Sequence, residues 1–462
     1  MTTAVVVFTR DLRVDDQPAL GAAARVADTV VPLFVFDDAI LGSSFNRPNR
    51  TGFLLESLAD LDTQLRALGG ALVVRRGDWI ATVVDIVRTT GAASVHVSGD
   101  VSAYARAREE RLRAAGAEHR FRVEITPGVT VVEPGALRPG NQNAHPEDGD
   151  HHYKVFTPYW RKWAATETRV LAMRPSRLAL PPGLDHGTPP TLGDLVVGTR
   201  SPDCAPGGTT EAHRLLDAWV HGPNGGLREY EARHDDLPGD ATSRLSPHLH
   251  FGTVSPGEIA AACAGRDGAE PFLRQLCWRD FYTQILAARP DAAWADYRDR
   301  GDRWRDDPDA LDALAAWKAG RTGYPVVDAG MRQLAQEGFV HNRARMIVAS
   351  FLTKDLSVDW REGARHYLDL LLDGDLANNN LNWQWVAGTG TDTNPNRIFN
   401  PTVQGKRFDP DGEYVRRYVP ELAALRGAAT HEPDASVRRA YDYPEPIVDH
   451  HLAIERYRQR RS

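Results

Sequence analysis

Cysteine and long apolar runs are scarce in this chain of 462 residues. The three cysteines, Cys204, Cys263 and Cys277, form no CxxC pair, which excludes a disulfide framework. No apolar run approaches the roughly 18 residues that a membrane-spanning helix needs. The first residues, MTTAVVVFTRDLR, lack the basic start and the cleavage site of a secretory signal. We therefore expect a reduced, cytoplasmic protein with no membrane partner.

A surplus of basic residues is absent as well. Fifty-five basic residues against 62 acidic ones give a net charge of −7, which argues against indiscriminate coating of nucleic acid. A local basic face is compatible with this balance. Only five of the basic residues are lysine. The planar guanidinium of arginine suits phosphates and carboxylates, although a GC-rich genome explains most of the arginines equally well.

The chain is too long for one ordinary core, because single cores stop growing at roughly 250–300 residues. Its first 125 or so residues alternate short β-branched runs with amphipathic helical patterns. This alternation predicts a parallel sheet covered on both faces, a Rossmann-like α/β domain. The first strand is followed by Thr9–Arg13 and not by a G-x-G-x-x-G turn, so the usual dinucleotide fingerprint is missing. The predicted strands are Ala4–Phe8, Val30–Phe36, Ala71–Val74, Ser94–Val97 and Phe121–Ile125.

The composition changes twice after the predicted sheet. Residues from about 126 to 205 are rich in Pro, Gly, Asp and His, which is typical of surface loops. From about 206 onward the pattern is helical, and Ser255–Glu258 has the hydroxyl, proline and glutamate of a capping box. We predict an α/β domain over 1–130, an interdomain linker over 131–205, and a mostly α-helical domain over 206–462.

Tryptophan is unevenly distributed, since nine of the eleven tryptophans follow residue 160. A helical core explains any single one of them. Aromatic surfaces that stack a flat cofactor or a flipped base, or rings that relay an electron, explain them equally well. The sequence position does not separate these interpretations.

Three polar clusters are candidates for binding a cofactor. The run Asp373–Asn380 holds two carboxylates and three amides between apolar segments, so its buried groups need partners such as the edge of a heteroaromatic ring. Asp240–Pro247 combines hydroxyls with an arginine before a helix, which favours an anion as well as ordinary capping. In His341–Met346, Arg345 is placed to neutralise Asp373 or Asp375. No His/Cys cluster has metal-ligand spacing, so we expect no metal.

Together these motifs resemble the photolyase/cryptochrome family, specifically the class I bacterial photolyases that repair cyclobutane pyrimidine dimers. The resemblance spans nearly the whole chain. It runs through FTRDLRVDDQPAL, TSRLSPHLHFG, CWRDFY, TGYPVVDAGMRQL, HNRARM, DWREGARHYLDLLLDGD and NWQWVAGTGTDTNPNRIFNP. It implies FAD in the helical domain, an antenna pigment at the α/β domain, and light-driven splitting of the dimer by electron transfer from reduced FAD. The partner is then DNA that contains pyrimidine dimers, and the expected state is a monomer.

The resemblance also implies the roles of individual residues. The FAD phosphate and ribityl seat would be Tyr230, Thr242, Ser243, Arg244, Leu245 and Ser246. The residues around the flavin ring would be Phe272, Arg279, Asn342, Arg345, Asp373, Asp375 and Asn379. The electron relay would be Trp383, Trp360 and Trp304. The lesion pocket and the DNA strand surface would comprise Gln275, Trp278, Met346, Trp385, Arg233, Arg343, Arg397, Gln404 and Lys406.

Two positions depart from the family pattern. Gln275 stands where many dimer photolyases carry a glutamate that bonds the thymine carbonyls, and glutamine cannot release a proton. We therefore predict less efficient splitting than in glutamate-bearing relatives. Phe272 replaces a tryptophan that some relatives carry near the flavin, which we expect to be a neutral exchange.

The antenna pigment follows from a smaller set of residues. Tyr104-Ala105 stands where folate-type relatives carry Asn-Glu, which disfavours methenyltetrahydrofolate. Relatives of the 8-hydroxy-5-deazaflavin type are more similar at Phe36, Arg50 and Asp100, with His250 at a position often held by lysine. We expect 8-hydroxy-5-deazaflavin.

Two alternatives within the family stay open. A (6-4) photolyase would also carry glutamine at the position of Gln275, but it would carry histidines in place of Asn342 and Met346. A cryptochrome, a light receptor without repair, would not need Trp278 and Trp385, and no long extension follows Ser462. A flavin storage or electron-transfer protein would not need the basic residues Arg343, Arg397 and Lys406.

Overall fold

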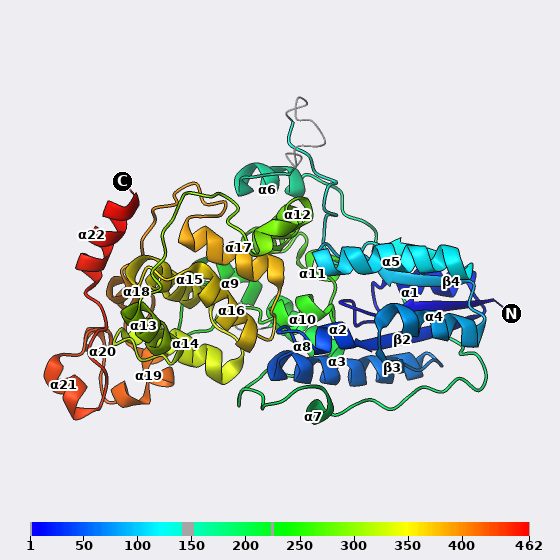
Figure 1. The fold of residues 1–462 in the computed structure, drawn as a ribbon, viewed down its shortest axis with the longest axis horizontal. Coiled ribbons are helices and arrows are strands. Elements are labelled where there is room, and N and C mark those ends of the chain that lie inside the picture. Colours follow the sequence, from blue (N-terminus) through cyan, green and yellow to red (C-terminus); the bar gives the residue numbers. More distant parts are fainter. Residues whose placement is uncertain (1, 141–151, 223–225, 462) are drawn as a thin grey trace. The chain divides into compact units, whose positions relative to one another are not determined.

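The fold is described by a computed structural model for residues 2–140, 152–222 and 226–461. Residues 141–151 of the predicted linker lie outside this range. The chain divides into two compact units, each formed by several segments (Figure 1). The sheet unit comprises Met1–Arg200, Ala205–Arg228 and Ser243–Pro290, and the helical unit comprises Ser201–Cys204, Glu229–Thr242 and Asp291–Ser462.

Five parallel strands form the core of the sheet unit, in the order β3-β2-β1-β4-β5. The strand order reverses direction between β1 and β4, which is where open α/β sheets bind ligands. The predicted α/β class is confirmed, and each predicted strand overlaps an observed one, although β3 begins two residues later and ends three residues later than predicted. The strands are β1 (Thr3–Val7), β2 (Thr29–Asp37), β3 (Val73–Gly77), β4 (Ser94–Ser98) and β5 (Arg122–Thr126).

The three central strands are buried along their whole length. The near-continuous apolar sequences of β1 and β2 predict this, whereas β4 also buries Ser94, His96 and Ser98. On one face, Val5, Leu33 and Val95 pack against the apolar sides of α4 and α5. The helices of this unit are α1 (Pro18–Val26), α2 (Asp38–Leu41), α3 (Pro48–Ala67), α4 (Trp79–Thr90), α5 (Ala103–His119), α6 (Phe156–Ala164), α7 (Leu192–Leu195), α8 (Thr209–His221), α9 (Gly226–Arg233, which continues into the helical unit), α10 (Ser246–Phe251), α11 (Pro256–Cys263) and α12 (Ala269–Ala288).

The short helix α10 is fixed directly to the end of β1. Arg10 Nε donates to the His250 carbonyl over 3.1 Å, and the Leu12 amide donates to the Phe251 carbonyl over 3.1 Å. Gly252 ends the helix at φ +66, and a Cβ there would overlap the Arg10 carbonyl. Glycine is required here both by the left-handed backbone and by the close approach of the chain.

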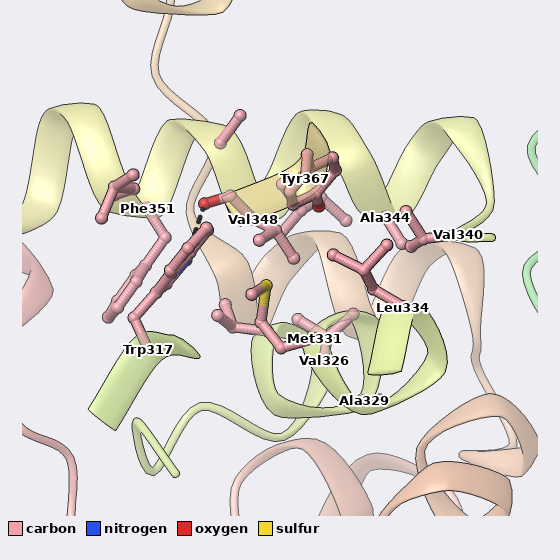
Figure 2. Close-up of a cluster of buried hydrophobic side chains, with 14 of the residues drawn as sticks. Trp317, Val326, Ala329, Met331, Leu334, Val340, Ala344, Val348, Phe351 and Tyr367 are labelled. Atoms are coloured by element: carbon pink, nitrogen blue, oxygen red, sulfur yellow. Dashed lines mark hydrogen bonds between the residues drawn. The ribbon is translucent and has the colours of Figure 1, made fainter. Parts of the chain in front are cut away.

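The helical unit has a core built around Trp317, Trp360, Tyr367 and Trp383. Trp317 is fully buried, and its Nε1 donates to the Val348 carbonyl over 3.2 Å (Figure 2). The elements of this unit are α13 (Pro308–Lys318), α14 (Pro325–Glu337), α15 (Asn342–Ser350), the π-helical turn η3 (Phe351–Asp355), α16 (Trp360–Leu370), α17 (Leu376–Ala387), α18 (Pro401–Phe408), α19 (Glu413–Tyr418), η4 (Pro420–Leu422), α20 (Ala428–His431), α21 (Ala435–Ala440) and α22 (His450–Arg461), with η2 (Pro290–Ala293) at its start.

The predicted capping box at Ser255 is present, and the Ser255 amide donates to the Glu258 carboxylate over 2.9 Å. None of the helices in the described residues has the length and hydrophobicity to cross a bilayer.

Candidate active site

The polar run Asp373–Asn380 leads into α17, and much of it is engaged by the protein itself. Asp375 caps the helix by accepting from the Asn378 amide over 2.9 Å. Asn380 donates to the Ala293 carbonyl over 2.5 Å. Gln384, one turn further on, donates to the Ala292 carbonyl over 2.7 Å. The buried amides Asn380 and Gln384 therefore hold the chain around η2, a long-range contact that their sequence context does not reveal.

Asp373 differs from these amides, because one of its oxygens is buried with no partner among the described residues. Oδ2 lies 3.4 Å from Arg345 Nη2, so the pair predicted between α15 and this run is present. Oδ1 is buried and accepts no hydrogen bond from the described residues. A buried acceptor costs free energy until a donor satisfies it. The N–H and hydroxyl donors of a flavin cofactor fit this position.

Asn379 and Trp383 occupy the same face of α17, since they are four residues apart. Both are buried, and this face packs on α16: Asn379 Nδ2 donates to the Ala364 carbonyl over 3.1 Å. The ring of Trp383 lies against Gly363, where a Cβ would approach Trp383 Cζ3 to 2.5 Å. Gly363 on α16 therefore leaves room for the ring of Trp383, which lies one turn after Asn379, the amide predicted to face the flavin.

The three predicted relay tryptophans belong to one aromatic core. Trp360 and Trp383 are 0% and 4% exposed, and Trp304 packs against the same core while partly exposed. Two further rings, which the sequence did not single out, contact Trp383 edge to face. Tyr367 is 5.1 Å away and Trp317 is 6.1 Å away, between ring centroids.

The predicted phosphate seat is distributed over both units. Tyr230 and Thr242 belong to the helical unit, and Ser243–Ser246 belong to the sheet unit. Burial, with a smaller contribution from Asp235, raises the pKa of Tyr230. Arg244 has a φ of +55, a left-handed conformation that is costly for arginine and is typical of functional turns.

Phe272 and Arg279, also predicted to lie near the flavin, both lie on α12 in the sheet unit. Phe272 contacts Trp219 at 5.3 Å between ring centroids. Arg279 is 9% exposed and donates to the Val129 carbonyl over 2.5 Å and to the Leu249 carbonyl over 3.3 Å.

The predicted antenna residues gather at the carboxyl ends of the strands. Arg10, which follows β1, bonds Asp100 after β4 over 3.2 Å and the His250 carbonyl over 3.1 Å. Phe45 lies 4.4 Å from the Arg50 guanidinium and 6.2 Å from the His250 ring. Neither Arg10 nor Phe45, the two side chains that connect the others, was predicted from the sequence.

Phe36, the last residue but one of β2, lies at the same edge and is buried. Beside it, the Tyr104 hydroxyl donates to the Asp37 carboxylate. Burial, followed by Asp37, raises the pKa of Tyr104 to about 12.

The predicted DNA-facing cations are all paired with carboxylates. Their ion pairs are Arg233–Glu229 at 3.2 Å, Arg343–Asp235 at 2.5 Å, Arg397–Asp392 at 3.5 Å and Lys406–Glu432 at 2.6 Å. Acidic neighbours that the motifs did not reveal therefore reduce the positive field of these cations.

The predicted lesion residues are distributed over both units. In the sheet unit, Gln275 is exposed, and Trp278 stacks on Phe156 at 3.7 Å between ring centroids. In the helical unit, the Arg397 guanidinium lies over the Trp385 ring, 5.2 Å from the ring centroid. Asn342 is exposed, and Met346 and Gln404 are partly buried.

Comparison with known proteins agrees with these observations. Residues 4–178 match the family described as DNA photolyase, and residues 272–462 match the FAD binding domain of DNA photolyase. The chain is 52% identical to the deoxyribodipyrimidine photo-lyase of Streptomyces griseus, over 100% of both chains.

Two solved structures share the fold. A bacterial class III photolyase from Agrobacterium tumefaciens is 34% identical with a TM-score of 0.89, covering 100% of this chain and 97% of that one. A cryptochrome from Synechocystis is 26% identical with a TM-score of 0.89, covering 99% of each chain. The chain therefore belongs to the DNA photolyase family and carries its FAD-binding domain.

Proposed function

We propose that this protein is a light-dependent DNA repair enzyme that splits cyclobutane pyrimidine dimers. The observation that carries the proposal is the buried face of α17, which places Asn379 one turn before Trp383 and close in sequence to the unsatisfied oxygen of Asp373. This is a seat for a redox-active ring with an oxidisable side chain next to it. Full-length identity to a curated photolyase supports the same activity.

FAD, when bound, supplies the excited electron donor for the reaction. Asp373 Oδ1 is the acceptor for one of its donor groups, and Arg345 holds that carboxylate in place through Oδ2. Asn379 uses its Nδ2 on the Ala364 carbonyl and on Asn380 Oδ1, so its Oδ1 is the atom left to accept a hydrogen bond from the ring. Trp383, Trp360 and Trp304 carry electrons inward from the surface to restore the reduced state.

Substrate recognition is assigned to both units. Trp278 and Trp385 provide aromatic surfaces for an extruded dimer, which is poorly stacked and therefore costs less to flip than a normal base. Gln275 is exposed and free to hydrogen-bond the pyrimidine carbonyls. Arg233, Arg343, Arg397, Gln404 and Lys406 would follow the strand.

We assign an antenna pigment to the carboxyl edge of the sheet, beside Phe36, Arg50, Asp100 and His250. The Arg10–Asp100 ion pair bridges β1 and β4 where the strand order reverses. We propose 8-hydroxy-5-deazaflavin as the pigment. Extraction and mass determination of the bound pigments tests this, because folate, a second FAD or no second pigment would each contradict it.

Illumination of the chemically reduced protein with two separate substrates tests the activity. DNA that contains cyclobutane dimers should be repaired under blue light and not in the dark. Repair of (6-4) lesions alone would make the protein a (6-4) photolyase. Repair of neither lesion by an FAD-loaded protein would identify a receptor of the cryptochrome type.

Gln275→Glu tests the role of the exposed amide. We expect a higher quantum yield of dimer splitting in the variant, because a carboxyl group can supply a proton that glutamine cannot. The yield per absorbed photon is measured on reduced enzyme saturated with substrate. A lower yield in the variant would contradict the prediction.

A further inference from the structure

The indole of Trp360 is fully buried, yet its nitrogen is bonded to a carboxylate. Trp360 Nε1 donates to Asp296 Oδ1 over 2.8 Å, and the Asp296 side chain is only 16% exposed. Charge-assisted hydrogen bonds of this kind are about twice as strong as neutral ones. We infer that Asp296 is a positioning residue of the electron relay, which stabilises the positive charge that Trp360 carries after it gives up an electron. This inference rests on the proposed function of Trp360.

The charges around Trp360 oppose one another. The Arg361 guanidinium lies 4.7 Å above the Trp360 ring, which stabilises the neutral ring and repels an oxidised one. Two carboxylates offset that cation: Arg361 Nη2 lies 2.8 Å from Asp296 Oδ1, and Nη1 lies 3.1 Å from Asp359 Oδ1. Two negative charges against one positive charge leave a net negative environment.

Trp383 has a different environment, since its closest ring contacts are the neutral side chains Tyr367 and Trp317. A positive charge is therefore more stable on Trp360 than on Trp383, because Coulomb attraction is weakly screened at buried positions. Asp296 is the carboxylate that touches the indole nitrogen itself, so it contributes most to this difference.

The step balances without a further reactant. FAD, when bound and photoexcited in its oxidised form, would supply the one-electron oxidant for Trp383, and one electron then passes from Trp360 to Trp383. Trp383 returns to its neutral closed-shell state, and Trp360 holds the unpaired electron and one positive charge. The Nε1 proton stays in the hydrogen bond to Asp296, so no covalent bond breaks.

Two substitutions of opposite sign test the inference. Asp296→Asn keeps an oxygen acceptor and removes the charge, whereas Arg361→Gln removes the cation above the same ring. Both are measured in oxidised FAD holoenzyme after a blue flash, without DNA or added reductant, by the transient absorption of tryptophan radicals. We expect Asp296→Asn to lower the yield of long-lived radical about three- to tenfold, the effect of one nearby charge. Arg361→Gln should match or exceed the parent.

The outcomes separate an electrostatic role from a structural one. Equal losses in both variants, or a parent-like yield in Asp296→Asn, would overturn the inference. If Asp296→Asn fails to bind FAD or has a lowered Tm, Asp296→Glu is measured in its place. Because Asp296→Glu restores the negative charge, we expect its radical yield to recover toward that of the parent. A failure of Asp296→Glu to recover would overturn the inference. A parent holoenzyme that forms no tryptophan radical would instead refute the relay in the proposed function, independently of Asp296.

Discussion

Gly363 lies in the middle of α16, directly under the ring of Trp383. Alanine in a helix normally stabilises it by up to about 1 kcal/mol relative to glycine. At Gly363 we expect the opposite, because the new Cβ would overlap Trp383 and Leu352. Gly363→Ala should lower the free energy of unfolding by about 1–3 kcal/mol and slow light-driven reduction of the flavin, measured by urea unfolding and by absorbance.

Gly193→Ala is the matched control, since Gly193 is also helical and a Cβ there meets nothing within 4 Å. A Gly363→Ala variant as stable as this control would show that Trp383 does not need the space that the glycine leaves.

Asp280 is a buried carboxylate whose charge makes stability depend on pH. Its Oδ2 accepts from the Val131 and Val132 amides and from Trp163 Nε1, each within 3.0 Å. Burial raises the pKa of Asp280 from 3.8 to about 6. The folded state therefore binds the proton more tightly than the unfolded state, so protonation as the pH falls below about 6 removes a destabilising charge.

Asp280→Asn carries no charge at any of these pH values and gives the reference. The parent should gain stability relative to this variant by up to about 3 kcal/mol between pH 7 and pH 4. Urea unfolding of both proteins across that range measures the difference. A difference that does not change with pH would contradict the raised pKa.

At the level of residues, the motifs predicted which side chains take part but not all of their partners. Arg345 was expected to pair with Asp373 or Asp375, and the structure selects Asp373. The Ala293 carbonyl that accepts from Asn380 lies 87 positions away in sequence, so no local pattern could reveal this bond. The roles of the predicted site residues toward FAD and DNA stay predictions.

The C-terminal helix α22 is attached to the π-helical turn η3 through a buried lysine. Lys354 Nζ donates to the Tyr457 hydroxyl over 2.6 Å and to the Ala387 carbonyl over 2.6 Å. His450, at the start of α22, bonds Asp355 in the same turn. A buried ammonium is costly unless acceptors surround it, and α22 supplies one of these acceptors through Tyr457. The helix therefore stabilises the core beside α17.

Tyr457→Phe tests that attachment, since it removes the acceptor and keeps the ring. We expect a loss of about 1.5–3 kcal/mol in the free energy of unfolding, as for hydrogen bonds to charged groups. Limited proteolysis should also release α22 earlier than in the parent. Tyr441→Phe, at an exposed tyrosine, is the control, and equal behaviour of the two variants would show that the hydroxyl is not needed.

At the level of elements, periodicity and caps were sufficient for much of the prediction. The strands and the capping box at Ser255 lie where the sequence placed them. The π-helical turn η3 was not predicted, because a single widened turn leaves no distinct hydrophobic period. The domain boundaries drawn from composition stay a proposal, and contacts divide the chain into interleaved segments instead of consecutive ones.

For the whole molecule, the net charge of −7 goes with a predicted DNA-facing surface whose cations are individually paired with carboxylates. Glu432→Gln removes the partner of Lys406 in an exposed pair. We expect tighter binding to damaged and undamaged duplex alike, up to about fivefold at low salt, because exposed pairs are worth about 0.2–1 kcal/mol. The gain should vanish at high salt, where phosphate contacts are screened.

Glu110→Gln, at an exposed glutamate on α5 of the sheet unit, controls for the change in net charge. Binding is measured as a salt titration with both duplexes. An equal gain in the two variants would show that only net charge acts, and no gain in either would remove Lys406 from the DNA surface.

The sequence by itself determined the α/β and helical division, the strand positions and the family, because periodicity and motif order are local properties that survive without coordinates. Only the tertiary structure decided that Asp373 keeps a buried oxygen to which no residue of the described chain donates, and that the amides Asn380 and Gln384 hold the chain around η2. It also placed Asp296 against the nitrogen of Trp360. The contacts of Asn380, Gln384 and Asp296 join positions that are far apart in the sequence, and the unsatisfied oxygen of Asp373 depends on no described residue donating to it. Only the packing of the folded chain brings such groups together or keeps them apart.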